Sequence, residues 1–262
     1  MDRTVTYGSA LVVAIWTLIP FYLITVSAFT PQSNISDYPK PILPSSVSVA
    51  TMRLFLESSG IVAALLNSLI AALVTVVAAL TLGAPAAYAL ARFRFRGRRA
   101  FQAVVLVTKM FPIAILAIPL ATILVRLGLY DSLISVALVH TAMAVPFVIL
   151  IVGGAFAASD DLEEAAETLG SSRWGAFLRV ALPPAMPALA AAAIFAFVIS
   201  WNEVFAASIL TVRTRTLPAQ ILASLSTMPL ALQFVAAFFM VLPAVVFFLL
   251  IRRSLRAAWG PR

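Results

Sequence analysis

The chain has 262 residues, of which 63% are apolar and 11% charged. This composition excludes an ordinary soluble domain, in which about half of the residues are apolar and about a quarter charged. The absence of cysteine excludes disulfides, thiol catalysis and Cys-based zinc or iron–sulfur sites. The net charge of +8 could indicate nucleic acid, but the basic residues cluster beside apolar runs. We therefore expect contact with membrane lipid and no nucleic-acid partner.

Six apolar runs predict an all-α membrane protein with six transmembrane helices, since about 20 residues are needed for each crossing. We expect the first run to be a retained span rather than a cleaved signal peptide. Gly83 and Pro85 predict a break or bend near the end of the second, and Lys109 and Pro112 interrupt the third. The expected spans are residues 7–29, 61–91, 100–125, 133–158, 188–210 and 231–251, which with a loop at 159–187 form one transmembrane domain covering 1–262.

The distribution of basic residues predicts the orientation of these spans. Five arginines lie between Arg92 and Arg99, after the second span, and the tail after residue 251 is also basic. Short cytoplasmic loops of membrane proteins carry an excess of Lys and Arg. We therefore predict a multi-pass protein of the bacterial plasma membrane with both termini and the loop at 159–187 in the cytoplasm.

The loop between the fourth and fifth spans has the pattern of two short helices with a bend. Asp160 and Glu163 form a capping-box pattern, in which each side chain satisfies a backbone N–H of the first turn. Gly170 is placed as a left-handed helix stop, and Ser171 or Ser172 can cap the second helix. This order of residues along the chain predicts an acidic first helix that ends in a sharp turn at Gly170.

The second helix of this loop is aromatic and basic. It carries Trp174, Phe177 and Leu178 on neighbouring turns, and we expect it to end before Pro183 because proline removes a helix hydrogen bond. A segment of this kind between two apolar spans lies in water. It is typical of a docking device, and the alternative is an interfacial amphipathic loop.

The loop resembles the EAA loop of ABC-importer permease subunits in Glu164-Ala165-Ala166, in Gly170 and in Leu182-Pro183, although Leu169 and Ser171 replace the usual Asp and Ala. In that family the loop is the coupling helix, which sits in a groove of the cytoplasmic ATPase. A Glu164 carboxylate facing a partner arginine would give a charge-assisted contact; its alternative role is helix-dipole stabilisation. We therefore predict ATPase-docking roles for Glu164, Ala165, Ala166, Gly170, Trp174, Phe177 and Pro183.

A wider resemblance covers residues 67–251 and carries the runs AYALARFRFRG, MFP, LGLYDS, LEEAAE and WNE. These runs are similar to the second, maltose-type membrane subunit of carbohydrate-uptake permeases. The resemblance implies the type I importer fold of six spans with a cytoplasmic helix-bend-helix coupling loop. It also implies a sister permease subunit, two ATPase subunits that bind ATP and Mg, and an extracytoplasmic solute-binding protein. The tail RRSLRAAWGPR departs from the Gly-rich ending of many such subunits.

Two charges fall inside apolar spans, Lys109 and Glu203. A charge within the bilayer is costly, so such residues usually face a cavity or a partner. We expect them to border the translocation path, or to pair with each other or with the sister subunit. Alternatively, Glu203 lies near the outer interface, and Lys109 snorkels or forms a structural ion pair. Asn67, Trp201 and Asn202 could bind or stack on a sugar, although polar side chains in spans more often tie helices together.

No catalytic site is expected in this chain. It lacks a Walker A pattern, so a partner must bind ATP, and His140 has no neighbouring ligands for a metal and is predicted to pack or to bridge helices. The resemblance implies a non-catalytic permease subunit for a di- or oligosaccharide such as maltose or trehalose, driven by alternating access. The alternatives are glycerol phosphate derivatives or compatible solutes in the same importer class, and, in other classes, a stand-alone secondary transporter or an intramembrane enzyme.

Overall fold

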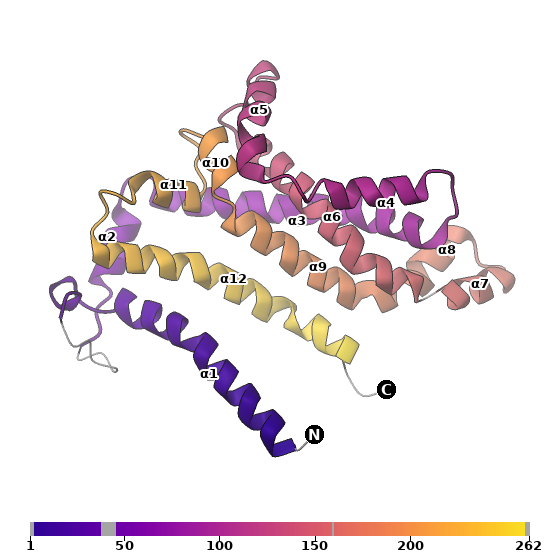
Figure 1. Ribbon diagram of the computed structural model, residues 1–262, viewed down its shortest axis with the longest axis horizontal. Coiled ribbons are helices and arrows are strands. Elements are labelled where there is room, and N and C mark those ends of the chain that lie inside the picture. Colours follow the sequence, from indigo (N-terminus) through magenta and orange to yellow (C-terminus); the bar gives the residue numbers. More distant parts are fainter. Residues whose placement is uncertain (1–2, 38–45, 159, 260–262) are drawn as a thin grey trace. The chain divides into compact units, whose positions relative to one another are not determined.

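The computed structural model describes residues 3–37, 46–158 and 160–259, and over these residues the chain contains helices and no strand (Figure 1). The first half comprises α1 (Arg3–Ala28), η1 (Gln32–Asn34), α2 (Ala50–Glu57), α3 (Ile61–Arg92), α4 (Arg98–Val107), α5 (Ile113–Arg126) and α6 (Leu133–Ala157). The second half comprises α7 (Asp160–Thr168), α8 (Arg173–Ala176), the π-turn η2 (Phe177–Ala181), α9 (Leu182–Asn202), α10 (Phe205–Leu210), α11 (Leu217–Ser224) and α12 (Leu230–Trp259). The prediction of an all-α fold is confirmed for the described residues.

The chain divides into two compact units. Unit 1 comprises Met1–Val62 with Ala223–Leu242, and unit 2 comprises Ala63–Leu222 with Pro243–Arg262. Within unit 1, ring contacts join the early helices to the first part of α12. The Phe29 and Phe238 rings lie 5.5 Å apart in an edge-on arrangement, and the Phe55 and Phe239 rings stack at 5.5 Å.

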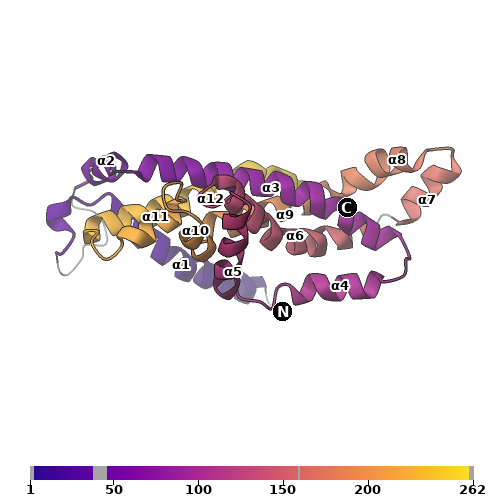
Figure 2. The same cartoon turned by 90° about the horizontal axis from the view of Figure 1, so that it is seen from above.

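Within unit 2, α6 and α9 pack along each other, and α3 runs beside them (Figures 1 and 2). The close approach of α3 to α6 depends on Gly83. A Cβ atom at this position would lie only 2.7 Å from Cγ1 of Val148 on α6. The sequence predicted a break or bend at Gly83 and Pro85, and a break is contradicted, because Pro85 lies inside a continuous helix. Helix α3 continues to Arg92, and Gly83 serves packing instead.

Five helices are long and apolar enough to cross a membrane, by length and composition, among the residues that the structure describes. They are Thr4–Ala28, Ile61–Arg92, Leu133–Ala157, Arg173–Asn202 and Leu230–Leu250. These correspond to the first, second, fourth, fifth and sixth expected spans, and the chain is a multi-pass membrane protein.

The third expected span, residues 100–125, is not one helix. It divides into α4 and α5, and Figure 1 shows α5 turned sharply out of line with α4. The interruption falls at Lys109 and Pro112, as the sequence indicated, because Pro112 adopts an extended conformation at the N-cap of α5 and has no N–H to continue the helix. The fifth expected span also divides, since α9 ends at Asn202 and α10 begins at Phe205.

Candidate functional site

The loop between α6 and α9 has the predicted helix-bend-helix form. Gly170 has φ +90°, a conformation that side chains disfavour. Its N–H donates to the carbonyl of Glu167 at 3.0 Å, and the N–H of Ser171 donates to the carbonyl of Ala166 at 3.0 Å. This pair of bonds is a Schellman motif that closes α7. The Ser172 hydroxyl then accepts from the N–H of Gly175 at 3.2 Å and caps α8.

The second helix of the loop does not end before Pro183, contrary to the prediction. The chain stays helical from Arg173 to Asn202. The π-turn η2 allows this, because the N–H of Leu182 reaches back to the carbonyl of Phe177, five residues earlier. Pro183 then falls in the first turn of α9, where a missing N–H costs little. The second helix of the loop is therefore continuous with α9, in a helix that is long and apolar enough to cross a membrane.

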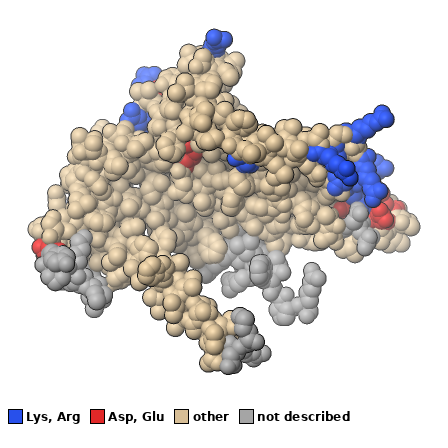
Figure 3. Space-filling model, in the orientation of Figure 1, with Lys and Arg blue, Asp and Glu red and all other residues tan. Residues whose placement is uncertain are grey.

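Several predicted docking residues are exposed at this end of unit 2. Glu164 and Ala165 on α7 are exposed, and Ala166 is half-buried. The bend and α8 present large apolar side chains, with Leu169 88% and Trp174 75% exposed. Figure 3 shows basic and acidic side chains gathered at the same end of the molecule. Exposed aromatic and charged groups side by side are typical of a protein-binding surface.

Phe177, by contrast, faces the helices of its own unit. Its ring lies 4.6 Å from the ring of Tyr88 on α3 and 6.0 Å from that of Phe156 on α6, while Trp174 packs edge-on against it at 6.2 Å. Phe156 also contacts Tyr88 edge-on at 5.4 Å. Phe177 thus anchors α8 and the π-turn to α3 and α6.

Glu163 is the residue that sequence analysis missed at this site. The capping box assigned its carboxylate to the start of α7, but the side chain is fully buried and turns to α3. The Tyr88 hydroxyl donates to Oε2 of Glu163 at 2.6 Å, and Nε of Arg92 lies 3.5 Å from the same oxygen. The Asp160 side chain, the other half of the box, lies outside the described residues. A contact across 75 residues leaves no local signal in the sequence.

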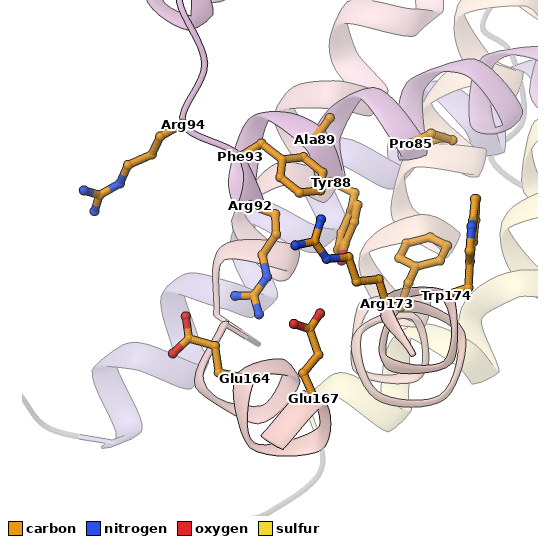
Figure 4. Close-up of a pocket in the computed structure, with 11 residues that line it drawn as sticks. Pro85, Tyr88, Ala89, Arg92, Phe93, Arg94, Glu164, Glu167, Arg173 and Trp174 are labelled. Carbon is orange, nitrogen blue, oxygen red and sulfur yellow. The ribbon is translucent and has the colours of Figure 1, made fainter. Parts of the chain in front are cut away.

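A pocket of about 690 Å³ opens beside this cluster (Figure 4). Figure 4 shows the guanidinium of Arg92 directed toward the carboxylates of Glu164 and Glu167, with Arg173 entering from α8. The pocket is lined by Pro85, Tyr88, Ala89, Arg92, Phe93, Arg94, Glu164, Glu167, Arg173, Trp174 and Phe177. The charges of both signs and the aromatic walls suit the side chains of a protein partner.

Lys109 lies at the break between α4 and α5. Its Nζ donates to the carbonyl oxygen of Met143 on α6 and lies 4.4 Å from the centre of the Phe147 ring. A carbonyl and an aromatic face are both favourable partners for a buried cation. Lys109 does not pair with Glu203.

Glu203 lies at the break between α9 and α10 and is 6% exposed. Its two carboxylate oxygens accept from the N–H groups of Ala206 and Ala207 at 2.8 and 2.9 Å, which caps α10. His140 on α6 joins this cap, with Nε2 at 3.2 Å from Glu203 and Nδ1 at 2.7 Å from the hydroxyl of Ser200. The prediction that His140 bridges helices is confirmed. Among the described residues, no group of three or more His, Cys, Asp or Glu side chains could hold a metal.

The remaining path candidates have different surroundings. Trp201 is 1% exposed and its ring stacks on Phe197, so it belongs to the core of unit 2. Asn67 donates from Nδ2 to the carbonyl oxygen of Arg215 at 3.0 Å and ties α3 to the loop after α10. Asn202 is exposed, and its Nδ2 donates to the carbonyl oxygen of Val198 within α9 at 3.0 Å.

A second cluster that sequence analysis missed centres on Asp131, in the turn between α5 and α6. Its Oδ1 accepts from the N–H groups of Val212, Arg213 and Thr214 at 2.9, 2.9 and 3.1 Å, and from the Thr214 hydroxyl at 3.1 Å. Oδ2 lies 3.2 Å from Nε of Arg213. Burial opposes ionisation, but these donors outweigh it and hold the pKa of Asp131 well below its ordinary value. We call Asp131 and the backbone of residues 212–214 the Asp131 clasp.

The sequence matches a family model over residues 79–259, more than half of the chain, and that model describes the inner membrane component of binding-protein-dependent transport systems. The chain belongs to this family of ABC transporter permeases. The resemblance that the EAA loop carried is therefore confirmed at the level of the family.

The chain is similar to two permeases of known description and to one chain of a solved structure. The trehalose transport system permease protein SugB of Mycobacterium tuberculosis is 33% identical over 84% of this chain and 80% of its own length. The diacetylchitobiose uptake system permease protein DasC of Streptomyces coelicolor is 32% identical over 74% of this chain and 71% of its own length. A chain of a bacterial ABC transporter involved in alginate import shares the fold, with a TM-score of 0.73, 22% identity and 96% of both chains covered.

Proposed function

We propose that this chain is one of two membrane-spanning subunits of a bacterial ABC importer for a di- or oligosaccharide. The observation that carries the proposal is the exposed α7–Gly170–α8 surface, which is continuous with spanning helix α9 and bonded to α3. A partner that moves this surface moves the helices that cross the membrane. The names of two relatives, a trehalose permease and a diacetylchitobiose permease, support the carbohydrate class.

In this proposal six segments cross the plasma membrane, with α4 and α5 together making the third crossing. The arginines between Arg92 and Arg99 follow α3, close to the α7–α8 end of unit 2, and the positive-inside rule puts that end in the cytoplasm with both termini. Two ATPase subunits bind ATP and Mg there, and Glu164 and Trp174 contact one of them. ATP binding and hydrolysis then drive alternating access, and a solute-binding protein delivers the sugar on the other side.

Among the path candidates, Lys109 and Asn202 fit a role at the path better than the others. Lys109 lies at a helix break beside an aromatic ring, a setting that suits a sugar-facing polar group. Asn202 is exposed one residue before another break. Glu203, Trp201 and Asn67 fit structural roles, because Glu203 caps α10, Trp201 is buried in the core and Asn67 ties α3 to the loop after α10.

Uptake by proteoliposomes that hold this chain, its sister permease and the ATPase pair tests the proposal. Radiolabelled trehalose and diacetylchitobiose are supplied with the solute-binding protein. We expect uptake only when ATP is enclosed and the binding protein is present. Uptake driven by an ion gradient without ATP would identify a secondary transporter instead. ATP-driven uptake of glycerol phosphate or a compatible solute, with none of either sugar, would overturn the substrate class.

In the same proteoliposomes, Lys109→Met tests the path. It keeps the length of the side chain and removes the charge. A path role predicts reduced sugar uptake with ATP hydrolysis and assembly retained. Normal uptake would exclude Lys109 from the path.

A further inference from the structure

Glu163 is a fully buried carboxylate in α7, where the side chains described from Leu162 to Thr168 are otherwise largely exposed. Its neighbours Leu162 and Glu164 are both exposed. Burying a carboxylate is costly unless it is paired and hydrogen-bonded. The position of α7 against unit 2 is therefore tied to the partners of this one side chain.

Those partners lie on a single face of α3, because Tyr88 and Arg92 are one helical turn apart. Oε2 of Glu163 accepts from the Tyr88 hydroxyl at 2.6 Å and faces Nε of Arg92 at 3.5 Å. The ring of Tyr88 also packs on Phe177 and Phe156. Tyr88 thus joins α3, α6, α7 and the π-turn at one point, and the whole docking loop is fixed to the end of α3.

The second carboxylate oxygen of Glu163, Oε1, can still accept hydrogen bonds. Oε1 is buried and has no hydrogen-bond partner among the residues that the structure describes. Arg92 approaches Glu163 through Nε, while the terminal nitrogens of its guanidinium lie toward Glu164 and Glu167 (Figure 4). If a cation of the ATPase takes over Glu164, Arg92 can turn its planar fork to both oxygens of Glu163. A bidentate pair of that kind is stronger and more directional.

We propose that Glu163, Tyr88 and Arg92 form a latch, the α3–α7 latch, which makes the docking loop move with α3 and tightens when the ATPase engages Glu164. Glu163 is then a positioning residue that couples ATP hydrolysis to transport. This inference rests on the proposed function. It adds a route by which movement of the docking loop reaches the membrane-spanning helices, namely through α3.

A double-mutant cycle in the complete importer tests the latch. Glu163→Gln keeps the shape and removes the charge, and Tyr88→Phe keeps the ring contacts and removes the hydroxyl. We expect each to lower the solute transported per ATP hydrolysed by about tenfold, the factor that a hydrogen bond to a charged group represents. The double variant should fall no further than Glu163→Gln alone. Glu57→Gln, the same exchange at an exposed pair with Arg53, should leave the ratio unchanged.

A distance measurement separates coupling from simple loss of structure. Because the chain has no cysteine, Leu82→Cys on α3 and Leu162→Cys on α7 place two spin labels at exposed positions. In the wild-type background we expect one narrow distance distribution, the same without nucleotide and in the vanadate-trapped complex. In Glu163→Gln the distribution should broaden and differ between the two states.

The outcomes distinguish the two proposals. If the wild-type complex takes up no solute with ATP, the proposed function fails, and the latch fails with it. If wild type couples ATP to uptake but Glu163→Gln and Tyr88→Phe couple equally well, the latch alone is wrong. A wild-type label distance that changes on vanadate trapping would also overturn it, since α7 would then move independently of α3.

Discussion

Two carboxylates tie distant segments of unit 2 together, and they are satisfied in opposite ways. Asp131 in its clasp accepts three backbone N–H groups on a single oxygen and has an arginine on the other. Glu163 in its latch meets only side chains and leaves one oxygen without a partner in the described structure. Backbone donors are fixed by the path of the chain, whereas tyrosine and arginine can change rotamer.

This difference indicates at which end of unit 2 the contacts can rearrange. The Asp131 clasp holds the turn after α5 against the loop after α10 in one geometry. The latch holds the α7–α8 loop against α3 through side-chain contacts. In a transporter, a fixed tie at one end and an adjustable tie at the other allow one end to respond to a partner while the other keeps its shape.

The largest effect is expected for Asp131→Ala, which removes every clasp bond at once. We expect the free energy of unfolding to fall by about 3 kcal/mol, since several hydrogen bonds to a charged group are lost together. Denaturant unfolding of the detergent-solubilised protein measures this. Asp131→Asn is the control, because asparagine keeps an acceptor oxygen and tolerates the observed φ of 55°. Equal losses in the two variants would show that the backbone bonds to Oδ1 contribute little.

Gly83→Ala should disturb the latch and spare the clasp. The added Cβ would lie 2.7–2.8 Å from Val148, so α3 must move away from α6 near Tyr88. Overpacking of this kind costs about 2 kcal/mol. Hydrogen exchange should become faster in α7 and stay unchanged at residues 212–214. Gly153→Ala is the matched control, because its Cβ meets nothing within 4 Å; faster exchange at the clasp in Gly83→Ala would contradict the separation of the two ties.

The clasp also predicts a pH dependence. The pKa of Asp131 is lower in the folded protein than in the unfolded chain, so its ionisation stabilises the fold above the ordinary aspartate pKa of about 4. The stability advantage of wild type over Asp131→Asn should be constant near neutral pH and shrink as the pH falls below that value. An advantage that grows on acidification would contradict the assignment.

The smallest effect is expected for Arg213→Ala. The Arg213 side chain is 91% exposed, and its ion pair with Asp131 is screened by water. Exposed pairs of this kind contribute about 0.5 kcal/mol or less. A loss as large as that of Asp131→Ala, measured by the same unfolding experiment, would mean that the clasp depends on the side chain rather than the backbone.

Local signals explain what the sequence predicted. Gly170 and Ser172 act within one helical turn of their positions, so the bend and the second cap could be predicted from the motif itself. The apolar runs predicted the long helices for the same reason. A helix end before Pro183 was wrongly predicted, because the π-turn η2 carries the helix through this position.

Long-range contacts explain what was missed. Glu163 pairs with a residue 75 positions away, and Asp131 binds backbone 81 positions away. In the sequence, Glu163 belonged to a local capping-box pattern, and Asp131 belonged to the run LGLYDS. Their partners are determined by which helix ends the fold brings together, and the pattern of a single sequence does not contain that information.

The proposal that the α7–Gly170–α8 surface docks an ATPase can be tested by co-purification from gently solubilised membranes. Tagged wild type is compared with Glu164→Ala combined with Gly170→Val, and with the exposed control Glu57→Ala. We expect wild type and control to retain both the sister permease and the ATPase, and the double variant to retain the permease and lose the ATPase. An ATPase that stays bound to the double variant as firmly as to wild type would contradict it.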